Sequence, residues 1–344
     1  MFKSNLKKNL QKFQKPLILL VLMVIMTILQ PKTFLTRNNF LSILYAISIY
    51  GIMVCGTIFP ILLGGIDLSV GSVAALSGAL TVMTILRFEQ TGVSVFWGVF
   101  VGLLSGALVG AVHGLIVSNF SVPPFLITLA TQNIVSGIAQ LITGNQTISC
   151  MEPHAFAIIG GGRFLSVPVP IYLLLFMGII SYIVLNKTIF GRQIYAVGGN
   201  PQASDLSGIA SKKVTIIAYL ISGFTAAMAG IVLASMNQQA ISKAATGYEN
   251  DVLTAIVVGG TSLMGGEGSI QGALFGALLV GILNNGLRLM GVPSTYHTVV
   301  KGIVIIIAVA FDIYSKNKGS GLQRSIFRKS RKKSKFVEEE SVVR

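Results

Sequence analysis

Apolar residues fill long stretches of this chain, and short polar segments separate them. A helix needs about 20 apolar residues to cross a bilayer core of about 30 Å, and every backbone amide inside the bilayer needs a partner within the protein. Ten stretches meet or approach this length. We therefore expect an all-α, polytopic integral membrane protein with about ten transmembrane helices. The expected spans are 16–30, 40–62, 68–86, 93–117, 123–142, 167–185, 213–236, 252–265, 270–290 and 294–314.

Composition supports this class, because 53% of the 344 residues are hydrophobic, 11% are charged and the mean hydropathy is +0.78. The first and eighth spans are short for a perpendicular crossing, so we expect their ends to shift by several residues. A transmembrane domain at 16–314 would then lie between a basic N-terminus, 1–15, and a basic tail, 315–344.

Basic residues predict the orientation, since Lys and Arg stay on the cytoplasmic side of a membrane. An even number of spans with both termini inside places 19 of the 26 basic residues in the cytoplasm and six outside. The net charge of +15 thus needs no nucleic-acid partner. The tail is expected to be a solvated cytoplasmic segment, and binding to anionic membrane lipid is the alternative.

Catalytic and metal-binding patterns are missing. The histidines (His113, His154, His297) and cysteines (Cys55, Cys150) show no metal-ligand spacing, and no nucleophile motif occurs. The segment GGTSLMGGEGS at 259–269 lacks the lysine of a phosphate-binding loop. We therefore expect no enzyme activity, no metal and no cofactor in this chain, and a transport pathway is favoured over an intramembrane enzyme.

Glycines recur at every fourth residue in the fourth span, and a shorter stripe follows in the ninth. This spacing lets another helix backbone approach closely, so helix packing is the expected role, with channel lining as the alternative. The glycines are Gly98, Gly102, Gly106, Gly110, Gly114, Gly272 and Gly276.

A polar connection at 186–213 carries its own pattern. Asn200-Pro201 predicts the start of a helix of two to three turns at 201–209, because proline suits the first helical position. Ala203, Leu206 and Ile209 then form an apolar stripe. This stripe would contact a partner, or the loop would pack on its own membrane domain.

Three stretches resemble one family. They are FGRQIYAVGGNPQASDLSGI within this connection, GIDLSVGS at 65–72, and GYENDVLTAIVVGGTSLMGGEGSIQGALFGALLVGILNNGLRLMGV at 247–292. They are similar to the ribose and other monosaccharide importer permeases of the ATP-binding cassette (ABC) superfamily, over about residues 16 to 314. The resemblance implies a permease homodimer in the plasma (inner) membrane of a prokaryote. An extracytoplasmic binding protein would deliver the sugar, and a separate cytoplasmic ATPase would bind ATP and Mg.

The resemblance implies that the connection is the cytoplasmic coupling loop. Its glycines and Asn200 would shape the turn, its helix would contact the ATPase, and Arg192 would contact an acidic rim. The residues are Gly191, Arg192, Gly198, Gly199, Asn200, Pro201, Ala203, Leu206, Gly208 and Ile209.

Few polar residues lie at membrane depth. Asp67, with Ser69, precedes a helical run and is expected to cap it; a gate or dimer contact, or contact with substrate, are alternatives. The other candidates for a translocation path are Gln132, Asn133, Gln140, Asn284 and Asn285, for which interhelical hydrogen bonding is the alternative. Lys301 would snorkel or pair with a carbonyl. The charges expected to dock a binding protein, together with Tyr248, are Lys243, Glu249 and Asp251.

An autonomous channel, facilitator or secondary transporter is the alternative class, and a membrane enzyme is more distant. The expected substrate is a small neutral polyhydroxylated solute. Ribose is the single expectation, and galactose, xylose, autoinducer-2 or a nucleoside are the alternatives that the resemblance leaves open.

Overall fold

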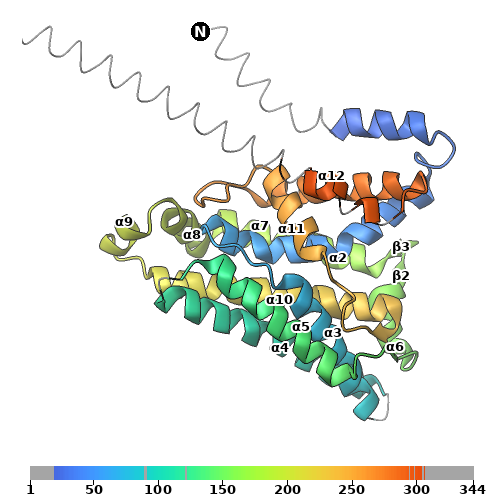
Figure 1. Ribbon diagram of the computed structural model, residues 1–344, viewed down its shortest axis with the longest axis horizontal. Coiled ribbons are helices and arrows are strands. Elements are labelled where there is room, and N and C mark those ends of the chain that lie inside the picture. The colour runs from blue at the N-terminus through green and yellow to red at the C-terminus, as the bar shows by residue number, and fades with distance from the viewer. Residues whose placement is uncertain are drawn as a thin grey trace, which may run out of the picture.

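The computed structural model describes residues 19–88, 91–120, 122–293, 295–297, 299–303 and 306. These residues are mostly helical, and the long helices lie side by side with α8 and α9 at one end and α6, β2 and β3 at the other (Figure 1). The elements are an apolar helix Leu19–Leu29, α2 (Arg37–Leu62), α3 (Val70–Arg87), α4 (Gly92–Asn119), α5 (Pro124–Thr143), β1 (Ile148–Ser149), α6 (His154–Gly161), β2 (Arg163–Phe164), β3 (Val167–Pro168), α7 (Val169–Lys187), α8 (Ile189–Gly199), α9 (Pro201–Leu206), α10 (Ser211–Asn237), β4 (Gln239–Ala240), α11 (Tyr248–Val258), α12 (Ile270–Leu289) and helical residues at 295–297 and 299–303.

Seven of these helices are long and apolar enough to cross a membrane. They are α2, α3, α4, α5, α7, α10 and α12, and each overlaps one of the ten expected spans. The first expected span corresponds to the shorter helix Leu19–Leu29, and the tenth is described only at its beginning. The segments 1–15 and 315–344 lie outside the described residues.

The eighth expected span, 252–265, does not form a spanning helix. Helix α11 has 11 residues, which at 1.5 Å per residue reach about half of a bilayer core. Glycines with positive φ at 260, 265, 266 and 268 turn the chain away from helical geometry after Val258. Their backbone groups find protein partners, since the Gly266 amide donates to the Leu62 carbonyl at 2.8 Å. Sequence hydropathy alone could not reveal this interruption.

The core is built around α2, α3 and α10. Every residue of α2 from 47 to 62 is buried, and α10 packs most extensively against α4, followed by α2 and α3. Burial on all sides is the property of a central helix. By contrast, α5 has only four buried residues, Thr128, Val135, Ala139 and Thr143.

The glycine stripe of α4 lies against the backbones of α3 and α10. A β-carbon at Gly98 would meet the Thr81 carbonyl oxygen of α3 at 2.8 Å, and one at Gly110 would contact Tyr219 and Leu220 of α10. The stripe passes between the two neighbours because a four-residue repeat drifts around the helix. The two glycines of α12 lie against α11 in the same way. Gly276 contacts Ala255 near the end of α11, and Gly272 contacts Gly259, the residue after α11.

The end of the bundle opposite α9 carries the short strands. Strands β1 and β4 pair antiparallel, with Ile148 opposite Ala240, and β2 pairs with β3, with Arg163 opposite Pro168. Helix α6 packs beside them against α10, where the Gly160 amide donates to Ser235 Oγ at 2.7 Å. The short strands and α6 therefore lie at one end of the long helices, and α8 and α9 lie at the other end (Figure 1).

Candidate functional site

The connection at 186–213 contains two helices where the sequence predicted one. Thr188 caps α8 by accepting a hydrogen bond from the Gly191 amide at 3.2 Å, and the buried side chains of Ile194 and Val197 hold α8 on the bundle. The helix predicted at 201–209 is shorter than expected. It ends at Leu206, because Gly208 adopts a φ of +82°.

Helix α9 starts as predicted from its sequence. Pro201 is its first residue, and the Asn200 side chain caps it by accepting a hydrogen bond from the Ala203 amide at 3.0 Å. The expected apolar stripe is only partly covered: Leu206 is 91% exposed, Ala203 is exposed, and Ile209 packs against the core. Two neighbouring apolar side chains are therefore free to contact another protein.

The glycines of α8 contribute to packing more than to a turn. A β-carbon at Gly198 would contact the Leu62 carbonyl and the Gly266 amide, and one at Gly191 would contact the Leu185 carbonyl. Gly199 ends the helix and is exposed, as is Arg192. Helix α8 thus rests directly on the end of α2 and on the glycine-rich segment 259–269.

The glycine-rich segment 259–269 is a part of this surface that the sequence analysis did not assign. The Tyr195 hydroxyl of α8 donates to the Gly268 carbonyl at 3.0 Å, which ties the segment to the connection. Met264 is 81% exposed on it. The segment and α9 therefore offer exposed apolar side chains at the same end of the bundle. The repeated glycines were the one feature of the sequence that could have indicated a non-helical segment here.

Asp67 is buried, with 4% exposure, and its carboxylate is fully engaged. One oxygen accepts hydrogen bonds from the Ser69 amide at 3.0 Å and the Ser69 hydroxyl at 2.7 Å. The other accepts from the Ser222 hydroxyl of α10 at 2.7 Å. The carboxylate thus joins Ser69, the residue before α3, to α10, whose first residues belong to the connection at 186–213.

Two further polar side chains lie beside this carboxylate. The rings of His113, on α4, and Tyr219, on α10, meet edge to face with their centres 6.1 Å apart. Among the described residues, neither His113 nitrogen nor the Tyr219 hydroxyl has a hydrogen-bond partner. Asp67 is therefore the fully bonded member of a larger buried polar group.

The polar residues of α5 face a weakly covered side of the bundle. Gln132 is partly buried and donates to the Glu249 carboxylate at 3.3 Å, whereas the exposed Asn133 donates to the Leu129 carbonyl of its own helix at 3.3 Å. Gln140 likewise bonds to Ser136 within the helix. Of these three, only Gln132 makes an interhelical hydrogen bond to a described residue.

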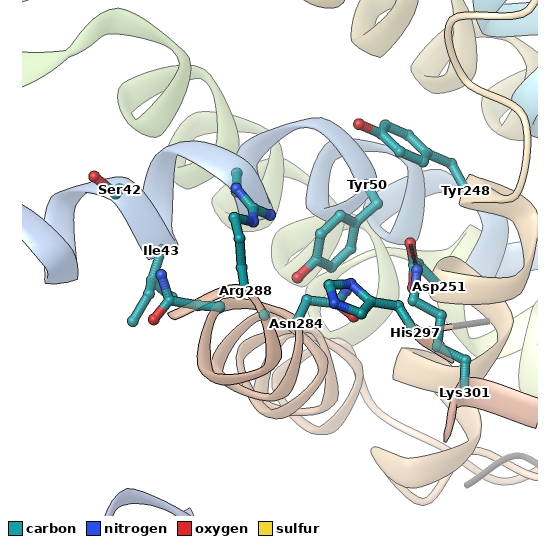
Figure 2. Close-up of a pocket in the computed structure, with 12 residues that line it drawn as sticks. Ser42, Ile43, Tyr50, Tyr248, Asp251, Asn284, Arg288, His297 and Lys301 are labelled. Atoms are coloured by element: carbon teal, nitrogen blue, oxygen red, sulfur yellow. Dashed lines mark hydrogen bonds and ion pairs between the residues drawn. The ribbon is translucent and has the colours of Figure 1, made fainter. Parts of the chain in front are cut away.

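The neighbours Asn284 and Asn285 have different surroundings. Asn285 and Asn39 exchange two amide hydrogen bonds, of 2.9 and 3.2 Å, which joins α12 to α2. Asn284 lines a cavity with residues of α2, α11, α12 and the helical segment at 295–303 (Figure 2). The structure therefore does not bring the predicted path residues together into one site.

The charges expected to dock a binding protein are largely internal, so that prediction is wrong for two of them. Asp251 is 3% exposed and Glu249 is 8% exposed. Lys301 reaches Asp251 Oδ1 at 2.8 Å, and Glu249 accepts hydrogen bonds from Gln132 and the Gly247 amide. Partners of this kind offset the loss of hydration that burial imposes on a carboxylate.

Lys301 was predicted to pair with a carbonyl or to snorkel. In the structure it instead forms this ion pair with Asp251. The sequence analysis missed Tyr50, Arg288 and His297, which line the same cavity. One signal was available, since ionisable residues within apolar stretches usually face a protein interior and pair with one another. Lys301 and Asp251 satisfy that description.

Comparison with known proteins places this geometry in a family. The family model described as "Branched-chain amino acid transport system / permease component" matches residues 39–309. The ribose import permease protein RbsC of Bacillus subtilis is 41% identical over 304 residues, covering 88% of this chain and 93% of the relative. RbsC of Escherichia coli K12 is 42% identical, covering 87% and 93%.

A permease named for another sugar is more distant. The L-arabinose ABC transporter permease protein AraH of Azospirillum brasilense is 32% identical, covering 88% of this chain and 87% of the relative. No solved structure matches the chain. The family match covers most of the described bundle, including α8, α9 and the cavity between α2, α11 and α12. The chain therefore belongs to the family of multi-pass membrane permeases that contains the sugar permeases of ABC importers.

Proposed function

We propose that this chain is the membrane-spanning subunit of an ATP-driven importer for ribose. The observation that carries the proposal is the 41–42% identity to ribose import permeases over 87–88% of the chain. The relative named for L-arabinose is less similar, at 32% identity, which makes ribose the preferred substrate.

The end of the bundle with α8 and α9 is proposed to face the cytoplasm, with both termini inside and ten crossings, the eighth of which is made by the short helix α11 together with the non-helical segment that follows it. This orientation places Lys187, Arg192, Lys212 and Lys213 in the cytoplasm, and it would place the 15 basic residues of the segments 1–15 and 315–344 there as well, as the positive-inside rule expects. Single cysteines at Leu206 and Leu165 test it, because the two side chains are 91% and 77% exposed, and Leu206 ends α9 whereas Leu165 lies between β2 and β3 at the opposite end of the bundle. A membrane-impermeant maleimide should label Leu165→Cys in intact cells and Leu206→Cys only after permeabilisation. The reverse pattern would overturn the orientation.

The proposed contact with the ATPase is made by α9 and the segment 259–269. Leu206 and Met264 supply exposed apolar contacts there. Because α8 rests on the backbone of Leu62 and Gly266, a displacement of α9 would be passed to α2 and α11 rather than absorbed by a free loop. ATP and Mg would be bound by that partner.

A second copy of the permease is proposed to pack on the side that includes α5. This helix has only four buried residues, and it presents Gln132 and Asn133 where a path between two copies would run. Weakly held hydroxyl contacts suit a path, because a solute that binds tightly would not leave.

Reconstitution in proteoliposomes tests the proposed function. Uptake of labelled ribose should require the permease, the ATPase, the binding protein and ATP together. L-arabinose and D-allose serve as competing substrates, since relatives are named for them. Ribose movement by this chain alone would indicate a facilitator, and uptake of another sugar in place of ribose would change the substrate.

A further inference from the structure

A polar cavity lies within a single copy of the chain, near the end opposite α9. Its volume is about 140 Å³, and Tyr50, Asp251, Asn284, Arg288, His297 and Lys301 line it (Figure 2). A second cavity of about 260 Å³ shares Tyr248, Asp251 and Lys301 with the first. The Asp251–Lys301 ion pair therefore stands between two polar spaces.

The cavity holds hydrogen-bond acceptors that no described residue satisfies. Asn284 Oδ1 is buried and accepts no hydrogen bond from the described part of the chain. His297 Nε2 lies 3.0 Å from the Val292 carbonyl, so a neutral ring donates there and leaves Nδ1 as an acceptor. A buried acceptor without a partner is costly, which favours a ligand that carries donors.

Donors are also present. Arg288 is exposed at the rim, and no acid among the described residues forms an ion pair with it. Lys301 donates to Asp251 Oδ2 at 2.9 Å and keeps further ammonium hydrogens, because it has three. A ligand that both donates and accepts fits this mixture, and hydroxyl groups do both.

The charges and the size of the cavity restrict the kind of ligand that it can hold. In the interior of the cavity the Lys301 ammonium offsets the charge of the Asp251 carboxylate, and the Arg288 guanidinium stays at the exposed rim, so the interior offers no net positive charge to an anion and a neutral solute is favoured. Tyr50 and Tyr248 meet edge to face, with ring centres 6.4 Å apart, and add an apolar wall. The volume is close to the roughly 150 Å³ that accommodates benzene in a protein core, and well below the roughly 300 Å³ at which pockets for drug-sized ligands begin.

From these contacts we propose that this cavity binds one small neutral polyhydroxylated solute, a monosaccharide, inside each copy of the permease. This inference rests on the proposed function for the identity of the sugar. It adds a site that is separate from the polar side of α5, because Asp251, Asn284 and Arg288 belong to α11 and α12. The hydroxyl groups of the sugar would donate hydrogen bonds to Asn284 Oδ1 and to His297 Nδ1, which receive none from the described residues.

Protection of a single cysteine tests occupancy directly. Ser42 is exposed and lines the cavity, whereas the native cysteines Cys55 and Cys150 are buried. In Ser42→Cys, ribose at ten times its dissociation constant should slow maleimide labelling about tenfold. Gln146→Cys, exposed at the same end and away from the cavity, is the matched control and should be unaffected. Inorganic phosphate at the same concentration should protect neither position.

A cavity-filling variant gives a second measurement. Ala46 lines the cavity one turn from Ser42 and from Tyr50 on α2, so Ala46→Phe should fill it and lower ribose uptake at least fivefold in the complete transporter. Val93→Phe adds the same bulky side chain at a position of α4 that is 67% exposed and does not line the cavity, so it should transport like the wild type. Ribose uptake by the wild-type transporter, measured in the same preparation, reports separately on the proposed function.

The labelling result decides the inference even where Ala46→Phe fails to fold. Unchanged labelling of Ser42→Cys at ribose concentrations that saturate wild-type uptake would overturn the binding site and leave the permease function standing. Protection by phosphate but not by ribose would overturn it as well. Absence of ribose uptake by the wild-type transporter would instead contradict the proposed function.

Discussion

Replacing Leu206 with glutamate should separate folding from coupling. The side chain is 91% exposed on α9, a helix whose only buried residue is Ser204. A surface substitution of this kind changes folding stability by about 0.5 kcal/mol or less. Leu206→Glu should therefore insert in the membrane and fold like the wild type.

The effect on the ATPase contact should be much larger. Burying a leucine side chain at an interface contributes about 1.5–3 kcal/mol, and a carboxylate at the same place loses that contribution and must also be desolvated. At 1.4 kcal/mol per factor of ten, the ATPase should bind at least about 10- to 150-fold more weakly. Leu206→Ala should have a smaller effect, because part of the apolar contact remains.

The affinity of the purified ATPase for the reconstituted permease measures this effect. Met151→Glu is the matched control and should leave the affinity unchanged, since Met151 is 67% exposed and lies three residues before α6, at the end of the bundle opposite α9. Ribose-stimulated ATP hydrolysis should fall together with the affinity. An unchanged affinity in Leu206→Glu would refute the assignment of α9 to the ATPase contact.

Three further predictions follow from buried contacts. Gly106→Val should lower the thermal stability of the purified permease, by about 1–3 kcal/mol or more, because its β-carbon would contact the Gly223 carbonyl of α10. Gly137→Val should be nearly neutral, since a β-carbon there would meet no other helix of the described chain within 4 Å, and equal melting temperatures of the two variants would contradict the packing role. Lys301→Met should lower the free energy of unfolding by about 3–5 kcal/mol, because it leaves Asp251 unpaired. Adding Asp251→Asn should restore most of this loss in a double-mutant cycle, and additive losses would argue against the ion pair. Burial raises the pKa of the Cys150 thiol, so its thiolate should form only at a pH above the usual range. At pH 7 the native protein should therefore react with maleimide far more slowly than the denatured protein, and equal rates would show that the side chain is accessible.

Hydropathy determined most of the transmembrane architecture without any tertiary information. Seven of the expected spans overlap helices that are long and apolar enough to cross a bilayer, because the bilayer itself sets the length of an apolar helix. Local chemistry also predicted the start of α9, since the Asn200 cap and Pro201 act within one turn. Both features depend on residues that are close in sequence.

The tertiary structure decided which polar residues meet. Asp251 and Lys301 are 50 residues apart, and Asn39 and Asn285 are 246 apart, so neither pair has a signature in the chain. The end of α11 at Val258 also depends on partners elsewhere, because Leu62 accepts the hydrogen bond of Gly266. An apolar sequence specifies that a helix enters the membrane, whereas the face that a polar side chain occupies, and the partner that compensates its burial, depend on how the helices pack.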